Sequence, residues 1–374
     1  MSVALRAALA AGALVLAACS TSSGPKPAEL SALPQARETR LLWSAVVGPA
    51  GAFVFIPALA GDSVVAAARN GTVMRLDAAD GKPRWRVELD VRLSAGAGAD
   101  LRTVAVATDE GEVLALDAET GKLRWRARVS SEVLAAPRLA DGLVLVRSAD
   151  SRIYAFDAED GKRRWAYQRA SSSLMVRTPA GLSVLQGSVY AGFSGGKLVS
   201  LGLANGGVRW EATVSLPKGA TELERVTDVV GDPAVVGREV CAAAFQGRIA
   251  CFDTQSGNQL WARDMSTVTG ASVDARYAYV SDDRGAVHAL DRSNGRSLWK
   301  QDRLAHRQLS LPLPLGAEIV LGDLQGYVHV LARDSGAFVA RAATDGSPVR
   351  GAPLRLPVGF LVQTQDGSLY ALAL

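Results

Sequence analysis

The feature that most constrains this chain is a sequence repeat with a period of about forty residues. The stretch GTVMRLDAADGKPRW at residues 71–85 returns as GEVLALDAETGKLRW at 111–125 and as SRIYAFDAEDGKRRW at 151–165. Each copy ends in a Trp that follows a Gly by four residues. Six copies are complete, with the pairs Gly81/Trp85, Gly121/Trp125, Gly161/Trp165, Gly206/Trp210, Gly257/Trp261 and Gly295/Trp299. The chain is therefore an array of similar units.

Each unit predicts short β-strands and tight turns. After residue 40, short runs rich in Val, Leu, Ala and Tyr are bounded by Gly, Asp and Asn, and stretches of helical period are scarce. The Asp that ends the apolar strand, at Asp117, Asp157 or Asp253, is expected to accept backbone N–H bonds in the following turn. The Gly supplies a positive φ, and the Trp covers a neighbouring unit while its indole N–H finds a partner.

The period and the strands together predict an all-β, eight-bladed β-propeller of four-stranded antiparallel blades. A seventh copy, GYVHVLARDSGAFVA, keeps Gly336 but has Ala340 where Trp is expected. The chain ends in GSLYALAL, an inner strand with no Trp strand after it, and RLLWSAVVG at 40–48 brings Trp43 with no inner strand before it. Pairing of these N- and C-terminal strands completes the eighth blade and closes the ring.

The N-terminus predicts export and lipid anchoring. Arg6 precedes the short apolar run AALAAGALVLAAC, whose end, LAAC, resembles the lipobox of bacterial lipoproteins. We expect residues 1–18 to be a lipoprotein signal peptide, Cys19 to be the lipidated first residue, residues 19–36 to be a flexible tether, and residues 37–374 to be the propeller. Ser20 after the Cys favours the periplasmic face of the outer membrane by resemblance to known sorting rules. An ordinary signal peptide with an incidental Cys is the alternative.

Charge and the other cysteines point to no further chemistry. The net charge is +4, but Lys and Arg are spread over the repeat turns without a dense basic run, so we expect no nucleic-acid partner. Cys241 and Cys251 lie ten residues apart on what the pattern predicts to be one hairpin. Two alternatives are open for an exported chain: a disulfide, or two small core residues, of which the second is the simpler expectation.

The pattern ALDAETGKLRW resembles the tryptophan-docking repeat of pyrroloquinoline-quinone dehydrogenases and their non-enzymatic relatives. The dehydrogenases imply adjacent cysteines and a calcium site, and this chain has no Cys-Cys pair. His288 and His329 occupy the same position in successive repeats, where packing is a simpler expectation than metal binding, and His306 has no acid, base or nucleophile beside it in the sequence. We therefore expect no enzyme activity, no catalytic residues, no cofactor and no metal site.

Over nearly its whole length the chain resembles the outer membrane protein assembly factor BamB family. That resemblance implies a non-enzymatic lipoprotein of the β-barrel assembly machinery, a monomer within a hetero-complex that binds the periplasmic domains of a BamA-like barrel protein. Unfolded outer membrane proteins are a further implied partner class. A generic periplasmic propeller scaffold with another partner, and a quinone-dependent dehydrogenase, are the alternatives.

The regular period is broken by two long connections, which contain the stretches LMVR and RVTDVV. Both follow a Trp strand on consecutive blades and are expected on the same rim of the ring, where loops carry binding sites. By resemblance to the contact segments of the family, the partner-binding residues are Leu174, Val176, Arg177, Arg225 and Asp228. Val230 replaces a second Asp of the family pattern. Alternatively, Arg177 and Asp228 merely pair with each other.

Overall fold

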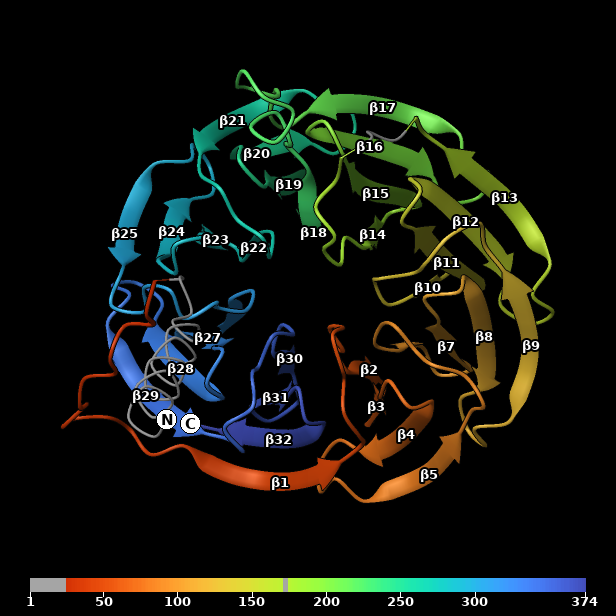
Figure 1. The fold of residues 1–374 in the computed structure, drawn as a ribbon, viewed down its shortest axis with the longest axis horizontal. Coiled ribbons are helices and arrows are strands. Elements are labelled where there is room, and N and C mark those ends of the chain that lie inside the picture. The colour runs from red at the N-terminus through yellow and green to blue at the C-terminus, as the bar shows by residue number, and fades with distance from the viewer. Residues whose placement is uncertain (1–24, 171–173) are drawn as a thin grey trace, which may run out of the picture.

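The computed structural model describes residues 25–170 and 174–374, so Cys19 and the expected signal peptide lie outside the described residues. Within the described ranges the chain is all-β, with strands arranged in eight four-stranded sheets around a ring (Figure 1). The predicted eight-bladed β-propeller is confirmed. The described ranges contain no helix that is long and apolar enough to span a membrane.

Each blade is one antiparallel sheet whose first strand lies innermost, and we number the blades I to VIII in chain order. The strands of the first four are, for blade I, β2 (Ala58–Ala60), β3 (Ser63–Ala67), β4 (Thr72–Asp77) and β5 (Pro83–Glu88); for blade II, β6 (Gly98–Ala99), β7 (Thr103–Ala107), β8 (Glu112–Asp117) and β9 (Leu123–Arg128); for blade III, β10 (Arg138–Ala140), β11 (Leu143–Ser148), β12 (Arg152–Asp157) and β13 (Arg163–Gln168); and for blade IV, β14 (Leu182–Leu185), β15 (Ser188–Phe193), β16 (Lys197–Gly202) and β17 (Val208–Thr213).

Blades V to VII repeat this plan, and blade VIII takes its outer strand from the other end of the chain. Their strands are, for blade V, β18 (Val229–Val236), β19 (Glu239–Ala244), β20 (Arg248–Asp253) and β21 (Gln259–Asp264); for blade VI, β22 (Ser272–Val273), β23 (Tyr277–Ser281), β24 (Val287–Asp291) and β25 (Ser297–Gln301); for blade VII, β26 (Leu313–Leu315), β27 (Glu318–Gly322), β28 (Tyr327–Ala332) and β29 (Phe338–Ala343); and for blade VIII, β30 (Leu354–Arg355), β31 (Phe360–Gln363), β32 (Ser368–Ala373) and β1 (Arg40–Val46).

Blade VIII closes the ring. Strand β1 pairs antiparallel with β32, with Arg40 opposite Ala373 and Val46 opposite Ser368. The predicted joining of the two terminal strands is confirmed, and β1 and β32 lie side by side in Figure 1. Blade VIII is therefore a four-stranded sheet like the other seven, although its outermost strand comes from the other end of the chain.

Alternation of strand direction gives the ring two unlike faces. The connections from each outer strand to the next blade lie on one side, together with the turns between second and third strands, and we call this side the loop face. The other two hairpin turns of each blade lie on the opposite side, which we call the turn face. Long connections can thus be inserted on the loop face without disturbing the sheets.

Blade-to-blade contact depends on the repeated Trp. Trp125 packs against the Gly161 turn of the next blade, where φ is +72° and a Cβ would lie 2.6 Å from the indole ring. Its indole N–H donates to the carbonyl oxygen of Ala158 at 3.0 Å. The same bond recurs at seven junctions, as Trp43–Ala78, Trp85–Ala118, Trp125–Ala158, Trp165–Leu203, Trp210–Thr254, Trp261–Arg292 and Trp299–Arg333. The expected roles of Trp and Gly are confirmed.

The turn chemistry is also as expected. The carboxylate oxygens of Asp117, Asp157 and Asp253 accept backbone N–H bonds from the turns that follow, at 2.9, 2.9 and 3.0 Å. These bonds hold the turn backbone in the shape that places the Gly under the neighbouring Trp. Each repeat therefore supplies both halves of the junction, a Trp for one neighbour and a Gly turn for the other.

The eighth junction explains the degenerate repeat. A Trp at position 340 would face blade VIII, and that blade has no turn between its third and fourth strands because they are the two ends of the propeller sequence. Ala340 is fully buried and packs in one cluster with Phe360 and Leu372 of blade VIII. The missing Trp is therefore a consequence of how the ring closes.

The two remaining cysteines form a disulfide. Cys241 on β19 and Cys251 on β20 are direct partners across the strands, both fully buried, and their sulfur atoms are bonded. The simpler expectation of two separate small core residues is wrong, because the predicted hairpin puts them in register. The bond lies inside blade V and does not link blades.

The histidines pack within their blades. His288 Nε2 lies 2.9 Å from Asp282 Oδ2, and His329 Nε2 lies 2.8 Å from Asp323 Oδ2. His329 is fully buried. Arg341 Nε donates to its Nδ1 at 3.3 Å, so Nε2 carries the proton that His329 donates to Asp323. In the described ranges, no group of three His, Cys, Asp or Glu side chains is placed to hold a metal ion.

We expect Trp125→Ala to lower the free energy of unfolding by about 3–5 kcal/mol, because it removes a buried ring and leaves a cavity between blades II and III. Trp125→Phe keeps part of the ring but loses the bond to Ala158, and should cost about 1 kcal/mol more than its volume change alone. Urea denaturation followed by circular dichroism measures both. Ala340→Trp, which restores the repeat pattern, should lower stability, and a stabilising effect would contradict our account of the eighth junction.

Burial lowers the pKa of His329 and outweighs the opposing attraction of Asp323. Because the folded protein resists protonation, stability is complete above the ordinary pKa of His, near 6.5, and falls as the pH drops below it. We expect the melting temperature to fall between pH 7 and pH 5, and His329→Gln, which keeps a donor toward Asp323, to flatten that fall. Comparison of the wild-type and His329→Gln profiles isolates the contribution of His329, and an unchanged profile in the variant would contradict this account.

Candidate partner-binding site

The two long connections lie together on the loop face. One joins β13 of blade III to β14 of blade IV, and the other joins β17 of blade IV to β18 of blade V. They contact each other directly, because the backbone N–H of Val176 donates to Asp228 Oδ2 at 2.6 Å. The expectation that LMVR and RVTDVV emerge side by side on one rim is met by this contact.

Asp228 is buried beneath the two loops and hydrogen-bonds to the backbone of the first. Its side chain is buried, with 6% of the residue exposed, which leaves little of it for a partner to touch. Burial raises the pKa of Asp228, and the bond from Val176 partly opposes the rise. Val230, two residues on, is buried within β18. These positions therefore fix the backbone of the loops, and their burial argues against direct contact with a partner.

Arg177 does not pair with Asp228. Its Nη2 and Nε donate to the two carboxylate oxygens of Glu132 at 2.7 and 3.2 Å, in the connection between blades II and III. Its guanidinium also lies 5.3 Å from the ring centroid of Phe53, before blade I. The bond to Glu132 raises the pKa of Arg177. The loop thus reaches across neighbouring blades, and Arg177 is held in one orientation with 54% of its side chain exposed.

The second loop contains a hydrogen-bonded turn that orders Arg225. Thr221 Oγ1 accepts the backbone N–H of Glu224 at 3.2 Å, while Glu224 Oε2 accepts the backbone N–H of Thr221 at 3.0 Å. This is the reciprocal pattern of a capping box. The backbone N–H of Arg225 donates to the carbonyl oxygen of Thr221 at 3.1 Å, and the side chain of Arg225 is exposed.

Large apolar side chains are exposed on both loops. Leu174 and Met175 are 41% and 40% exposed on the first loop, and Leu216 and Leu223 are 59% and 71% exposed on the second. We call these four residues, with Arg177 and Arg225, the loop surface. Of the predicted contacts, Leu174, Arg177 and Arg225 are exposed, Val176 is half-buried and Asp228 is buried.

Sequence analysis missed Met175, Leu216, Leu223, Phe53 and Glu132. Met175 stands between two predicted contacts, and the two leucines lie in the broken period, so their place in the loops was the available signal. No signal linked Phe53 or Glu132 to Arg177, because those contacts join connections of different blades.

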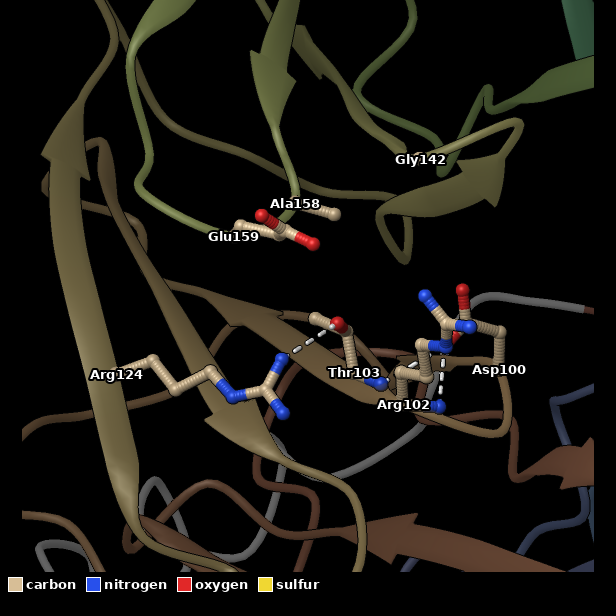
Figure 2. Close-up of a pocket in the computed structure, with 7 residues that line it drawn as sticks. All are labelled: Asp100, Arg102, Thr103, Arg124, Gly142, Ala158 and Glu159. Carbon is tan, nitrogen blue, oxygen red and sulfur yellow. Dashed lines mark hydrogen bonds between the residues drawn. The ribbon is translucent and has the colours of Figure 1, made fainter.

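The turn face has shallow polar depressions between blades. Figure 2 shows one between blades II and III, of about 520 Å³, in which Arg124 donates to Thr103 Oγ1 at 3.3 Å. Asp100 Oδ1 there accepts the backbone N–H groups of Arg102 and Thr103. A second depression of about 550 Å³ occupies the same position one blade further on. Because the depressions recur at equivalent positions, they are a consequence of the repeat. Their polar groups form hydrogen bonds that are typical of β-turns.

We expect Asp228→Ala to loosen the Leu174–Arg177 segment, because the N–H of Val176 loses its acceptor at a cost on the order of 1 kcal/mol. Hydrogen exchange at the Val176 amide should quicken, while exchange in the strands stays unchanged. Asp228→Asn keeps an acceptor oxygen and should retain protection. Glu222→Ala, an exposed position in the same loop, is the control. Unchanged exchange in Asp228→Ala would show that the loop is held by other contacts.

Comparison with known proteins gives the family. The family model described as outer membrane protein assembly factor BamB matches residues 26–95 and 69–301. The protein of that name from Bordetella pertussis is 43% identical over 363 residues, covering 96% of this chain and 94% of the relative. The one from Pseudomonas aeruginosa is 44% identical over 370 residues, covering 98% and 97%.

Solved structures agree. BamB from Moraxella catarrhalis superposes with a TM-score of 0.83 at 26% identity, covering 90% of this chain and all of the other. The quinohemoprotein alcohol dehydrogenase from Comamonas testosteroni reaches a TM-score of 0.69 at 14% identity, which is a likeness of fold alone. The family is one of assembly factors and not of enzymes. The repeat, the closed eight-bladed ring and the near full-length relatives together place this chain in the outer membrane protein assembly factor BamB family.

Proposed function

We propose that this chain is a non-enzymatic scaffold lipoprotein that takes part in outer membrane protein assembly and binds a periplasmic domain of a BamA-like barrel protein through the loop surface. The role in assembly rests on relatives named for it that cover nearly the whole chain. The identity of the partner and of the contact residues is our proposal.

The loop surface has the composition of a binding site. Four large apolar side chains exposed by 40–71% lie near Arg177 and Arg225 on two loops that are hydrogen-bonded to each other. Arginine and large side chains dominate the energy of protein interfaces. The single observation that carries the proposal is that these residues lie on the two connections that break the repeat.

Ordering of the loops before binding favours affinity. Arg177 is already fixed by Glu132 and Phe53, and Val176 by Asp228, so little conformational freedom remains to be lost when a partner binds. The bidentate bond to Glu132 leaves the other side of the guanidinium exposed. A partner carboxylate or carbonyl can bond to Arg177 without displacing Glu132.

Lipidation of Cys19 at the periplasmic face of the outer membrane belongs to the same proposal. Cys19 lies outside the described residues, and the support is the order of charged residue, apolar run and LAAC in the sequence. A diacylglyceryl group on Cys19 would keep the scaffold at the membrane where its partner is embedded.

Arg177→Glu should weaken binding to the periplasmic domains of the BamA-like protein of the same cell by about 30-fold or more, equivalent to about 2 kcal/mol. Isothermal titration calorimetry measures it. The matched control is Lys122→Glu, the same change of charge at an exposed position on the turn face, which should leave affinity within about twofold.

Leu223→Asp provides a second variant, because its side chain is 71% exposed and the substitution leaves the core intact. It should also weaken binding, and melting curves will confirm that all three proteins stay folded. Wild-type affinity in both Arg177→Glu and Leu223→Asp would overturn the proposed surface. Absence of binding by the wild-type protein to any barrel-assembly component would favour a scaffold with another partner.

A further inference from the structure

We infer that residues 25–37, which we call the strap, fix where the lipid anchor leaves the propeller and turn the loop face toward the bilayer, so that a partner on the loop surface lies between propeller and membrane. The inference rests on the proposed lipidation of Cys19. It deepens the proposed function by stating from which side the partner approaches.

Within the expected tether, residues 19–36, the structure describes residues 25–36, and these make several bonds to the propeller. The first fixed point of the strap is Ala28, whose N–H donates to the carbonyl oxygen of Ala305 at 2.9 Å and whose carbonyl oxygen accepts from Arg307 Nη1 at 2.8 Å. Both partners lie in the connection between blades VI and VII, which runs on the loop face. The start of the strap is therefore tied to the loop face.

Arg307 is an unusual anchor because only 2% of it is exposed. Its Nε donates to Asp323 Oδ2 at 2.7 Å and its Nη2 to Gln325 Oε1 at 2.7 Å. Burial alone would raise the pKa of Asp323, but the bonds from His329 and Arg307 outweigh it and lower the pKa. The buried Arg307 thus keeps a charged partner, and the carbonyl oxygen of Ala28 satisfies a donor that would otherwise be buried without one.

The middle of the strap fills the seam between blades VI and VII. Leu30 packs against the apolar cluster that contains Leu304 and Phe338. Arg341 Nη1 donates to the carbonyl oxygen of Ser31 at 3.0 Å, and Arg303 Nη2 donates to Ser31 Oγ at 2.6 Å. Two arginine side chains and one leucine contact hold this stretch in place.

The strap then runs along blade VII to the turn face. The N–H of Arg37 donates to the carbonyl oxygen of Val339 near the start of β29 at 2.9 Å, and the Arg37 side chain bonds to Glu318 at the start of β27. Three residues later the chain enters β1 at Arg40. The direction is therefore fixed: the end nearer to Cys19 is on the loop face and the other end is on the turn face.

The short length of chain between Cys19 and the docked strap limits how the propeller can be oriented at the bilayer. Ala28, the first fixed point of the strap, is nine residues from Cys19, and nine residues span at most about 30 Å. Without the docked strap, the eighteen residues from Cys19 to Arg37 would span up to about 60 Å and leave the propeller free to turn. Since a strand of six residues is itself about 20 Å long, the loop face at blades VI and VII is the part that the short link holds nearest to the bilayer.

The consequence concerns the partner. The loop surface lies on the same face, on blades III to V, so a domain that binds it occupies the space beside the membrane. A membrane-proximal periplasmic domain fits that space, and a domain approaching from the turn face does not.

The test compares two labelled positions in blade VI. Arg284→Cys is on the loop face and Arg296→Cys on the turn face, both exposed. Cys241 and Cys251 are joined in the disulfide, and Cys19 is blocked in the lipoprotein, so one fluorophore is attached per variant. Full-length lipoprotein is reconstituted into phosphatidylethanolamine–phosphatidylglycerol vesicles that contain nitroxide-headgroup lipids. We expect at least threefold stronger quenching at position 284 than at 296.

A strap variant identifies the cause. Replacing residues 27–33 with a Gly/Ser segment of equal length should bring quenching at the two positions to within about 1.5-fold, while the β-sheet circular dichroism spectrum persists. Equal quenching in the intact protein, stronger quenching at 296, or a difference that survives strap replacement would each overturn the inference. Mass spectrometry and vesicle flotation distinguish failure of this inference from failure of the proposed function. If Cys19 is unmodified and the protein does not float with vesicles, the proposed lipid anchor is wrong. If the protein floats but quenching is equal at the two positions, only the proposed orientation is wrong.

Discussion

The structure depends on one contact, an indole wedged against the glycine turn of the next blade. The ring of Trp125 occupies the space that a Cβ on Gly161 would take, and its N–H satisfies a carbonyl oxygen that the turn leaves unpaired. Repeated at seven junctions, this contact joins sheets whose strands do not pair with one another. It makes a rigid ring from blades that could not bury their apolar faces alone.

Rigidity of the ring explains why the candidate site is on connections. The loops that carry Leu174, Arg177 and Leu223 can differ from the regular connections because the sheets below them do not depend on the loop sequence. Their order comes from a few bonds, among them Val176 to Asp228 and Arg177 to Glu132. A fixed frame with pre-ordered loops is what a scaffold that brings partners together needs.

The fold could be predicted from the sequence because the residues that determine each turn and each contact between blades lie close together in the chain. A Gly four residues before a Trp predicts both the turn and the contact between blades. The unmatched terminal strands predict how the ring closes. The site was predicted only in part. Asp228 has the residue type of a contact but is buried, the pairing of Cys241 with Cys251 needed the strand register, and Glu132 reaches Arg177 across blades. The burial of Asp228 and the contact between Glu132 and Arg177 have no period or spacing that could predict them, whereas the ten-residue spacing of the cysteines left the disulfide open as an alternative. The strap was missed for the same reason, since its composition is that of a solvated linker while its bonds go to arginines far along the chain.

Closure of the ring by β1 and β32 also sets a sequence of events. A chain that is synthesised from its N-terminus can form blades I to VII as their strands arrive, with an indole at each junction between them. Strand β1 must wait, because its partner is the last strand to emerge. Until then one apolar edge stays open at the junction that lacks an indole, next to the blade on which the strap docks. Completion of the propeller therefore depends on a strand that is made after the other strands of the ring, so a chain that stops before β32 would leave β1 without its partner and the ring open.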